Sequence, residues 1–246
     1  MAAPVPTGER LALVFGHSLP DAAFLDRGER HEHPGRQGAA PVVAVDTGDV
    51  VVLRRHGVEH FSPAHTVDHH RNLEILAEMG CNKIVALAST GSLRTDWPPG
   101  TMVAPDDFFA LGVTPTFHDD AQGHTVAGFD LPWRRRVVEA WRASVATPLV
   151  DGGVYAQTTG PRFESPAEVR FLADYADLVG MTLVSELVLA REAGISYAAL
   201  CTIDNLANGL DTGTLAVEEF WANKAANEQR MASDLDLLLP ALLAVS

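Results

Sequence analysis

Short apolar runs alternate with amphipathic stretches along most of this chain of 246 residues. Apolar runs bounded by turn residues predict β-strands, and they lie at Arg10–Phe15, Val42–Asp46, Val50–Arg54, Lys83–Ala88, Met102–Val103, Phe108–Leu111, Tyr155–Thr159 and Tyr197–Ile203. Apolar positions at helical spacing predict α-helices, and they lie at Asp68–Gly80, Leu131–Val145, from Ser165 onward, Leu183–Ala193 and Val217–Leu239. Because strands alternate with helices from end to end, the pattern predicts an α/β fold with a mixed or parallel central β-sheet flanked by helices.

Three segments carry more specific predictions. Ser165-Pro166, with Glu168 at capping-box distance, indicates the start of a helix. The run Arg134–Arg136 predicts a basic face on the helix at Leu131–Val145. Asp21–Ala40 is rich in charge, Gly and Pro, and is predicted to be a surface excursion. No repeat or low-complexity linker divides the chain, so we expect a single domain over residues 1–246.

The composition limits the classes of partner. A formal net charge of −14 argues against nucleic acid or anionic membranes as partners. It also requires that any phosphate ligand be met by a few local cationic or N–H groups. Cys81 and Cys201 occur beside or within apolar runs, which indicates neither a disulfide framework nor a cysteine metal cluster. The polar start lacks the apolar region of a signal peptide, so we expect a cytoplasmic protein.

Polar residues that could hold an anion follow several predicted strands. Small residues and hydroxyls at strand ends allow a close backbone approach to an anion, and an arginine fork can make two parallel bonds to a tetrahedral one. The candidates are Gly16-His17-Ser18, Arg54-Arg55-His56-Gly57, Ser89-Thr90 and Thr182. Taken singly, each is equally compatible with a structural turn or a solvated surface residue.

Taken together, these segments resemble a known family in their order along the chain. The family pattern Arg-His-Gly-x-x-His is intact from Arg55 to His60, and the stretch Thr90–Phe108 resembles the family's Gly-Ser-Leu…Pro-Gly-Asp…Asp-Asp-Phe segment. Thr159–Asn205 contains a Gly-Pro-Arg-Phe-Glu turn, a Gly-Met-Thr turn and a strand ending in Asp-Asn. In this respect the chain resembles the purine nucleoside phosphorylase and methylthioadenosine phosphorylase superfamily.

The resemblance implies a phosphate site and a reaction. It places orthophosphate at Ser18, Arg55, His56, Ser89 and Thr182. It implies reversible phosphorolysis of a purine nucleoside, with catalytic roles for Asn205, Arg55 and His56. Phosphate is the co-substrate, and neither a metal nor an organic cofactor is needed. Relatives are mostly trimers, or hexamers built from trimers, so the resemblance implies a homotrimer or hexamer with purine nucleoside and phosphate as its ligands.

The resemblance also implies a base site and a sugar site. Phe163 and Glu164 match positions that stack on the purine and hydrogen-bond its edge, and Met181 matches one that packs on the sugar. Asn205 matches the position that contacts purine N7, where a donor stabilises the charge of the leaving base. Relatives selective for 6-aminopurines carry Asp-x-Asp here, whereas this chain has Asn205 and Ala207, which favours 6-oxopurines.

Several alternatives stay open. The 5′ pocket could take a hydroxyl or a methylthio group, because the loop Phe117–Phe129 that would complete it from a neighbouring subunit matches the family weakly. The rival functions are a methylthioadenosine phosphorylase proper, a hydrolase that uses water, and a non-catalytic nucleoside-binding protein. Ser185 in place of the family's Pro, Gly-His-Ser in place of Gly-Thr-Gly, and Ala88 support the last of these. The ten histidines lack a metal-ligand spacing, so no metal site is expected.

Overall fold

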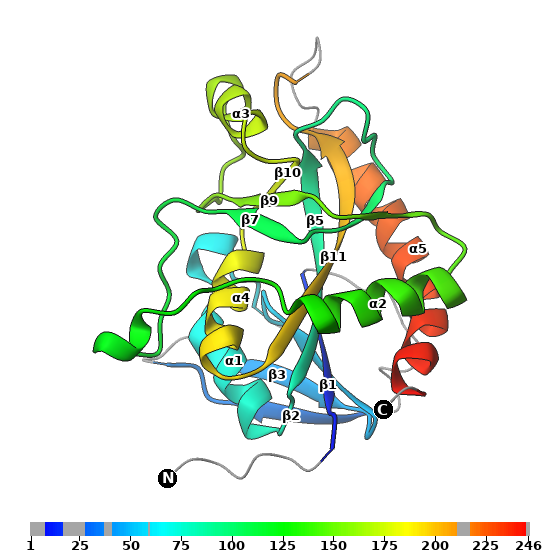
Figure 1. Cartoon of the computed structure of the whole chain (residues 1–246). Coiled ribbons are helices and arrows are strands. Elements are labelled where there is room, and N and C mark those ends of the chain that lie inside the picture. Colours follow the sequence, from blue (N-terminus) through cyan, green and yellow to red (C-terminus); the bar gives the residue numbers. More distant parts are fainter. Residues whose placement is uncertain (1–7, 17–27, 37–40, 59, 211–216, 245–246) are drawn as a thin grey trace.

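The computed structural model describes residues 8–16, 28–36, 41–58, 60–210 and 217–244. Its centre is a mixed β-sheet in which β1 (Leu11–Phe15) lies between β4 (Val50–Arg54) and β5 (Lys83–Ser92), all parallel. The strand β11 (Ser196–Leu206) runs parallel to β5 along nearly its whole length, so these two long strands form a central spine (Figure 1). The predicted α/β fold with a mixed sheet is confirmed.

Shorter strands extend the sheet on both sides of this spine. They are β2 (Glu29–His33), β3 (Val42–Asp46), β6 (Met102–Ala104), β7 (Asp107–Phe109), β8 (Leu149–Asp151), β9 (Val154–Gln157) and β10 (Leu178–Gly180). Beyond β4, the strands β3 and β2 continue the sheet in antiparallel fashion. Beyond the end of β5 follow β10, β9 and β7, and β6 connects β11 to β8.

The helices cover both faces of the sheet. They are α1 (His69–Glu78), α2 (Leu131–Ser144), α3 (Pro166–Ala173), α4 (Leu183–Glu192) and α5 (Val217–Leu243), with the short turns η3 (Ala64–Thr66) and η4 (Ala121–Gly123). In Figure 1, α1 and α4 lie on one side of the spine, and α2 and α5 lie on the other. A smaller apolar cluster packs α3 against β9 and β10.

Two apolar layers arise from the period of two in the strands. Ala12 and Val14 of β1 pack with α1 and α4, whereas Leu11, Leu13 and Phe15 pack with α2 and α5. All of these side chains are buried because both faces of the parallel strands are covered, which explains their continuously apolar sequence. The candidate anion-binding residues follow at the carboxyl ends of these buried strands.

The structure differs from the sequence predictions in several elements. The segment predicted as a surface excursion contains the edge strand β2, whose largely exposed ERHEH sequence has no apolar signal. The strands β8 and β10, of three residues each, were not predicted. β5 continues to Ser92 and β11 to Leu206, so the polar residues at their ends belong to the strands.

Arg134 is buried, which corrects the predicted basic face of α2. Its guanidinium donates to the carbonyl oxygens of Ala104 and Pro105 at 2.6 and 2.9 Å and to the Asp151 carboxylate at 2.6 Å. Arg134 therefore ties α2 to β6 and β8, and the predicted exposure of this face holds for Arg135. A run of arginines does not distinguish a solvated helix face from a buried anchor.

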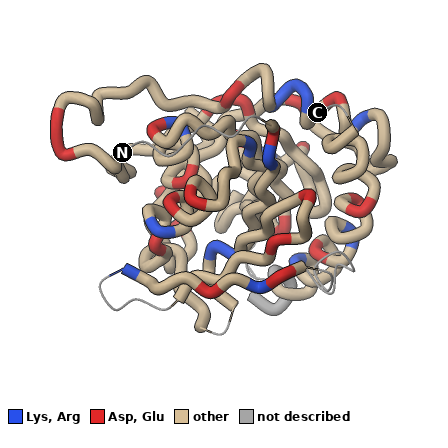
Figure 2. Tube along the Cα trace, turned by 90° about the horizontal axis from the view of Figure 1, so that it is seen from below, with Lys and Arg blue, Asp and Glu red and all other residues tan. Residues whose placement is uncertain are grey.

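Acidic positions are spread around the whole fold, as Figure 2 shows. Among the residues drawn in this view, Lys and Arg are interspersed with Asp and Glu, and the net charge of −14 disfavours binding of a polyanion. Within the described ranges, the helices are too short or too polar to span a lipid bilayer.

Candidate active site

A cavity of about 590 Å³ lies where the carboxyl ends of β1, β4, β5 and β11 meet the end of β10 and the helix α5. Open α/β sheets commonly bind ligands at such strand ends, and the volume suits a small-molecule substrate. The predicted site residues among its lining are Arg55, His56, Ser89, Phe163, Glu164, Met181, Thr182, Asn205 and Ala207. Ser18 lies outside the described residues. The structure thus brings together nine predicted positions that are dispersed over the chain.

Arg55 is held by a buried carboxylate. Its Nε donates to Glu186 Oε1 at 2.5 Å and its Nη2 to Glu186 Oε2 at 3.2 Å. Nη1 donates to the Leu87 carbonyl at 2.8 Å, and Nη2 also reaches the Val14 carbonyl. Burial would raise the pKa of Glu186, but the guanidinium outweighs it and lowers that pKa.

This pairing corrects one detail of the sequence prediction. An arginine fork was expected to grip phosphate through two parallel bonds, but the fork of Arg55 grips Glu186. Within the described residues, one Nη1 N–H is left over for a ligand, since the guanidinium has five. Arg55 can therefore make a single direct bond to an anion while Glu186 balances its charge.

His56 follows Arg55 and is uncharged at neutral pH. Burial, followed by the charge of Arg55, lowers the pKa of His56 to about 4. The Nδ1 atom lies 2.7 Å from the Ser62 carbonyl oxygen, which can only accept, so Nδ1 carries the proton. Nε2 is then an acceptor. A phosphate at Nε2 would therefore bring the proton of that hydrogen bond as its own P–OH group.

The start of α4 is capped in an unusual way. Within the described residues, the Thr182 side chain makes no capping bond although it holds the N-cap position. Gln157 of β9 takes over this role, because its Oε1 accepts from the N–H groups of Val184 and Ser185 at 2.6 and 3.1 Å. Gln157 Nε2 donates to the Ser185 hydroxyl at 2.7 Å. The Thr182 hydroxyl therefore remains for a ligand, and Ser185 has a structural reason to replace the family's Pro.

A β-bulge in β11 aims two neighbouring side chains in different directions. Ile203 pairs with Thr90 and Asn205 with Gly91, which leaves Asp204 as the extra residue. The amide of Asn205 lines the cavity, and its Nδ2 donates to the Leu206 carbonyl at 2.7 Å. This bond orients the amide and leaves a second N–H for a ligand. A Cβ atom at Gly91 would lie 3.4 Å from Nδ2, so glycine keeps the space beside this amide open.

Asp204 points toward α5 and changes the expected role of Ser89. The Ser89 hydroxyl donates to Asp204 Oδ2, and Asn227 Nδ2 donates to Oδ1 at 2.6 Å. Burial raises the pKa of Asp204 in spite of these hydrogen bonds. The family resemblance places Ser89 at the phosphate site, but the proton of its hydroxyl is committed to Asp204. In this structure the Ser89 oxygen offers lone pairs to a ligand.

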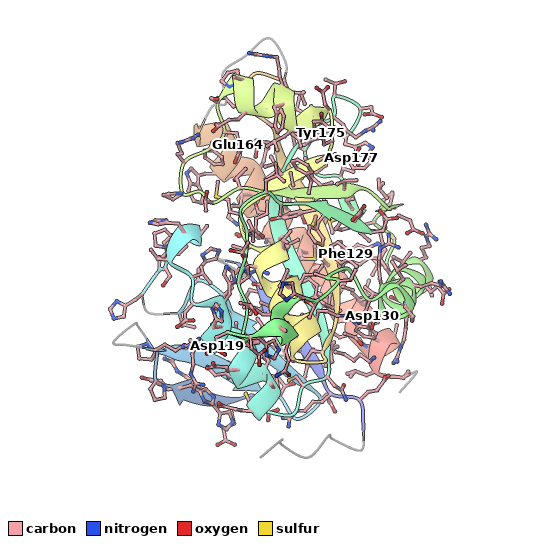
Figure 3. The ribbon with its side chains drawn as sticks, turned by 60° about the vertical axis from the view of Figure 1, so that its left-hand side comes forward. Asp119, Phe129, Asp130, Glu164, Tyr175 and Asp177 are labelled. Atoms are coloured by element: carbon pink, nitrogen blue, oxygen red, sulfur yellow. The ribbon has the colours of Figure 1, made fainter. Side chains whose placement is uncertain are left out.

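Glu164 occupies the opposite part of the cavity, in the loop that precedes α3. Figure 3 shows it toward the same end of the molecule as Tyr175 and Asp177. The Thr158 hydroxyl donates to Glu164 Oε1 at 2.6 Å, so one carboxylate oxygen is oriented and the other can accept from a ligand. Gly160, at φ +63°, leads into this loop, and a Cβ there would lie 2.4 Å from the Met181 sulfur. Glycine therefore permits Met181 to lie beside the loop.

The cavity also includes residues that the sequence analysis did not identify. Trp221 and Lys224 come from α5, while Phe61, Pro63 and Ala64 come from the segment after β4. His56 stacks on Phe61 with ring centroids 5.2 Å apart. Trp221 and Lys224 lie three residues apart and so share one helix face. Their spacing was visible in the sequence, but nothing local indicated that this face covers a cavity.

Because of His69, which lies behind the cavity, we expect the stability of the fold to be sensitive to acid. His69 is buried, its Nδ1 lies 3.8 Å from Glu186 Oε1, and burial lowers its pKa from 6.5 to about 4. Between these pH values the unfolded chain binds more protons, so stability falls as the pH decreases. Acidification from pH 7.5 to 4.5 should lower the free energy of unfolding of the wild type by about 2–3 kcal/mol more than that of the His69→Gln variant.

Urea unfolding at both pH values checks this expectation. Equal losses of unfolding free energy in the two proteins would contradict it. His65→Gln serves as a matched control, because His65 is exposed on η3 and should behave as the wild type does.

Comparisons with known proteins agree with this architecture. Residues 5–239 match the phosphorylase superfamily. A probable 6-oxopurine nucleoside phosphorylase of Archaeoglobus fulgidus is 36% identical over 190 residues, covering 77% of this chain and 78% of the relative. A probable S-methyl-5′-thioinosine phosphorylase of Methanocaldococcus jannaschii is 35% identical over 191 residues, covering 75% and 74%.

The fold has a solved counterpart as well. The methylthioadenosine phosphorylase from Schistosoma mansoni in complex with adenine has a TM-score of 0.78 to this chain. The match covers 97% of this chain and 92% of that chain at 24% identity, and it shows a shared fold. The family match spans nearly the whole sequence, and the relatives match over most of their own length. The chain therefore belongs to the phosphorylase superfamily.

Proposed function

We propose that this protein is a purine nucleoside phosphorylase that transfers the sugar of a 6-oxopurine nucleoside or 5′-methylthionucleoside to phosphate. One observation carries the proposal: Arg55, His56 and Thr182 line the same cavity as Asn205 and Glu164. The first group suits a small oxyanion, and the second presents an amide donor and a carboxylate acceptor to a base. The names of the relatives, which include 6-oxopurine nucleoside and methylthioinosine phosphorylases, support it.

In the proposed reaction, phosphate and purine lie on opposite faces of the sugar carbon C1′. The remaining Nη1 N–H of Arg55, the Thr182 hydroxyl and His56 Nε2 hold phosphate. As the glycosidic bond breaks, C1′ becomes oxocarbenium-like and the phosphate dianion stabilises it. The phosphate oxygen then bonds to C1′ with inversion, and the electron pair of the broken bond leaves on the purine. Alignment of the two substrates can supply about 7–11 kcal/mol, so no cofactor beyond phosphate is required.

The leaving purine is held by Asn205 and Glu164. The free Nδ2–H of Asn205 donates to N7, where negative charge develops. Glu164 accepts from N1–H, a proton that a 6-oxopurine has and adenine lacks. Phe163 and Met181 line the cavity beside the base and the sugar. Ala207 is buried in an apolar cluster, so it supplies no acceptor for a 6-amino group.

Purine release from a nucleoside panel tests the proposal. With phosphate present, we expect cleavage of inosine or methylthioinosine with a higher kcat/KM than of adenosine or methylthioadenosine. Preference for methylthioadenosine would favour a methylthioadenosine phosphorylase proper, and equal release without phosphate would favour a hydrolase. Binding of a nucleoside without any release would leave a non-catalytic binding protein.

The same proposal covers domain organisation, assembly and location. We assign residues 1–246 to one nucleoside phosphorylase-like domain, a proposal supported by the single sheet that connects the strands from β1 to β11. A homotrimer or hexamer is the proposed assembly, which size-exclusion chromatography with light scattering can measure. The cytoplasm, where nucleosides and phosphate are available, is the proposed location.

A further inference from the structure

The proposed phosphate site is short of positive charge. Among the lining residues that the structure describes, those able to carry a positive charge are Arg55, His56 and Lys224. Arg55 is balanced by Glu186 through two hydrogen bonds, and His56 is neutral, with its proton on Nδ1 donated to the Ser62 carbonyl. Glu164 adds a negative charge to the same cavity. A phosphate dianion would therefore enter a cavity that these groups alone do not make cationic, in a protein of net charge −14.

Lys224 lies at the end of the cavity that contains the proposed phosphate-binding residues. It lines both the large cavity and a neighbouring cavity of about 60 Å³, and the two share Gly16, Ala88 and Ser89. Gly16 directly follows β1 and lies beside the side chains of Arg55 and His56, and Ala88 and Ser89 lie in the second half of β5. The side chain of Lys224 is 12% exposed, so its ammonium is largely shielded from the solvent.

The surroundings of the ammonium leave donors for an anion. Lys224 Nζ donates to Glu228 Oε1 at 2.5 Å, one helical turn further along α5. An ammonium group has three donors, so a bond to Glu228 leaves two. Asp204 faces the small cavity as well, where its two oxygens accept from Ser89 and Asn227. The flexible four-carbon stem lets the ammonium move toward a ligand, as a fixed guanidinium cannot.

We propose that Lys224 is a phosphate-binding residue, whose ammonium donates to an oxygen of orthophosphate seated against the end of β1 and adds a donor to those of Arg55 and Thr182. This assignment rests on the proposed function. It gives α5, which also lines the cavity with Trp221, a direct part in binding phosphate. When phosphate binds, the ammonium bridges the anion and Glu228.

Steady-state kinetics of the full-length protein test the assignment. Lys224→Met should raise KM for phosphate about 10- to 100-fold, the usual effect of losing a hydrogen bond to a charged group, with KM for inosine nearly unchanged. Lys224→Arg keeps the charge and should recover most of the affinity for phosphate. Glu228→Gln breaks the same ion pair but keeps the ammonium, so it should not raise KM for phosphate.

The possible outcomes distinguish phosphate binding by Lys224 from a purely structural role of this residue, and they distinguish failure of this assignment from failure of the proposed function. An unchanged KM for phosphate in Lys224→Met, or a rise confined to KM for the nucleoside, would overturn the assignment. Equal effects of Lys224→Met and Glu228→Gln would show that the ion pair merely stabilises α5. If the wild type releases no purine, the proposed function fails, and calorimetric titration of inorganic phosphate into the wild type and Lys224→Met still decides the role of Lys224.

Discussion

Replacing Asn205 with alanine should lower turnover about 100- to 1,000-fold while nucleoside binding changes little, by analogy with the loss of one transition-state donor. The amide is held beside the cavity by its bond to the Leu206 carbonyl at 2.7 Å. In the proposed reaction, its free N–H donates to a purine N7 that is only weakly basic in the nucleoside. As the bond to C1′ breaks, negative charge accumulates on the base and the same hydrogen bond becomes stronger. Binding energy that appears only in the transition state raises kcat and leaves the ground state nearly unaffected.

The measurement is kcat and KM for inosine at saturating phosphate. A fall in kcat/KM that comes entirely from a higher KM would place Asn205 in ground-state binding and contradict the proposed role. Asn82→Ala is a matched control, because Asn82 lies before the first residue of β5, at the opposite end of that strand from the cavity. Its amide holds the backbone at Gly8 and Arg10, so its loss should affect stability and spare turnover.

Arg55→Met should both abolish activity and destabilise the fold by about 3–5 kcal/mol, the cost of breaking a buried ion pair from one side. Glu186 is 1% exposed and would keep a charge without its partner. The Leu87 and Val14 carbonyls would lose their donor as well. The Tyr197 hydroxyl donates to Glu186 Oε2 at 2.8 Å, but this neutral donor cannot balance the carboxylate.

A second variant separates folding from binding. Arg55→Met combined with Glu186→Gln removes both charges and keeps an acceptor for Tyr197, so most of the lost unfolding free energy should return. Activity should stay absent, because the N–H that faces phosphate is still missing. Urea unfolding and purine release measure the two effects. A double variant that regains activity would contradict the role of Arg55, and one as unstable as the single variant would show that the charge of Glu186 is not the cause.

The candidate site residues could be named from the sequence because short motifs resemble a known family in their order along the chain. Apolar runs such as Lys83–Ala88 mark buried strands, and polar residues that could hold an anion follow several of them, but singly these signals decided nothing. What could not be predicted was the hydrogen-bond partner of each polar group, and whether the group donates or accepts. Ser89 and Asp204 are 115 positions apart, and Arg55 and Glu186 are 131 apart. No periodic pattern reports such pairs.

Some elements escaped prediction for a related reason. The edge strand β2 has no apolar face of its own, so it is defined by its pairing with β3. Arg134 is as polar as its exposed neighbour Arg135, but carbonyl groups from β6 and the chain after it surround its guanidinium. Gln157 caps α4 although it belongs to β9, since the strand end and the helix start meet in space.

The sequence by itself determined the α/β class and most of its strands and helices, which follow from the period of two in strands, the period near four in helices and the turn residues between them. Its resemblance to a known family, carried by short motifs, indicated nine of the positions that line the cavity. Only the tertiary structure decided that Arg55 is balanced by Glu186, that Ser89 donates to Asp204, and that Lys224 lines a cavity with Gly16 and Ser89. Charges and hydrogen bonds inside a fold depend on which groups packing brings within about 3 Å of each other, and distance along the chain carries no information about that.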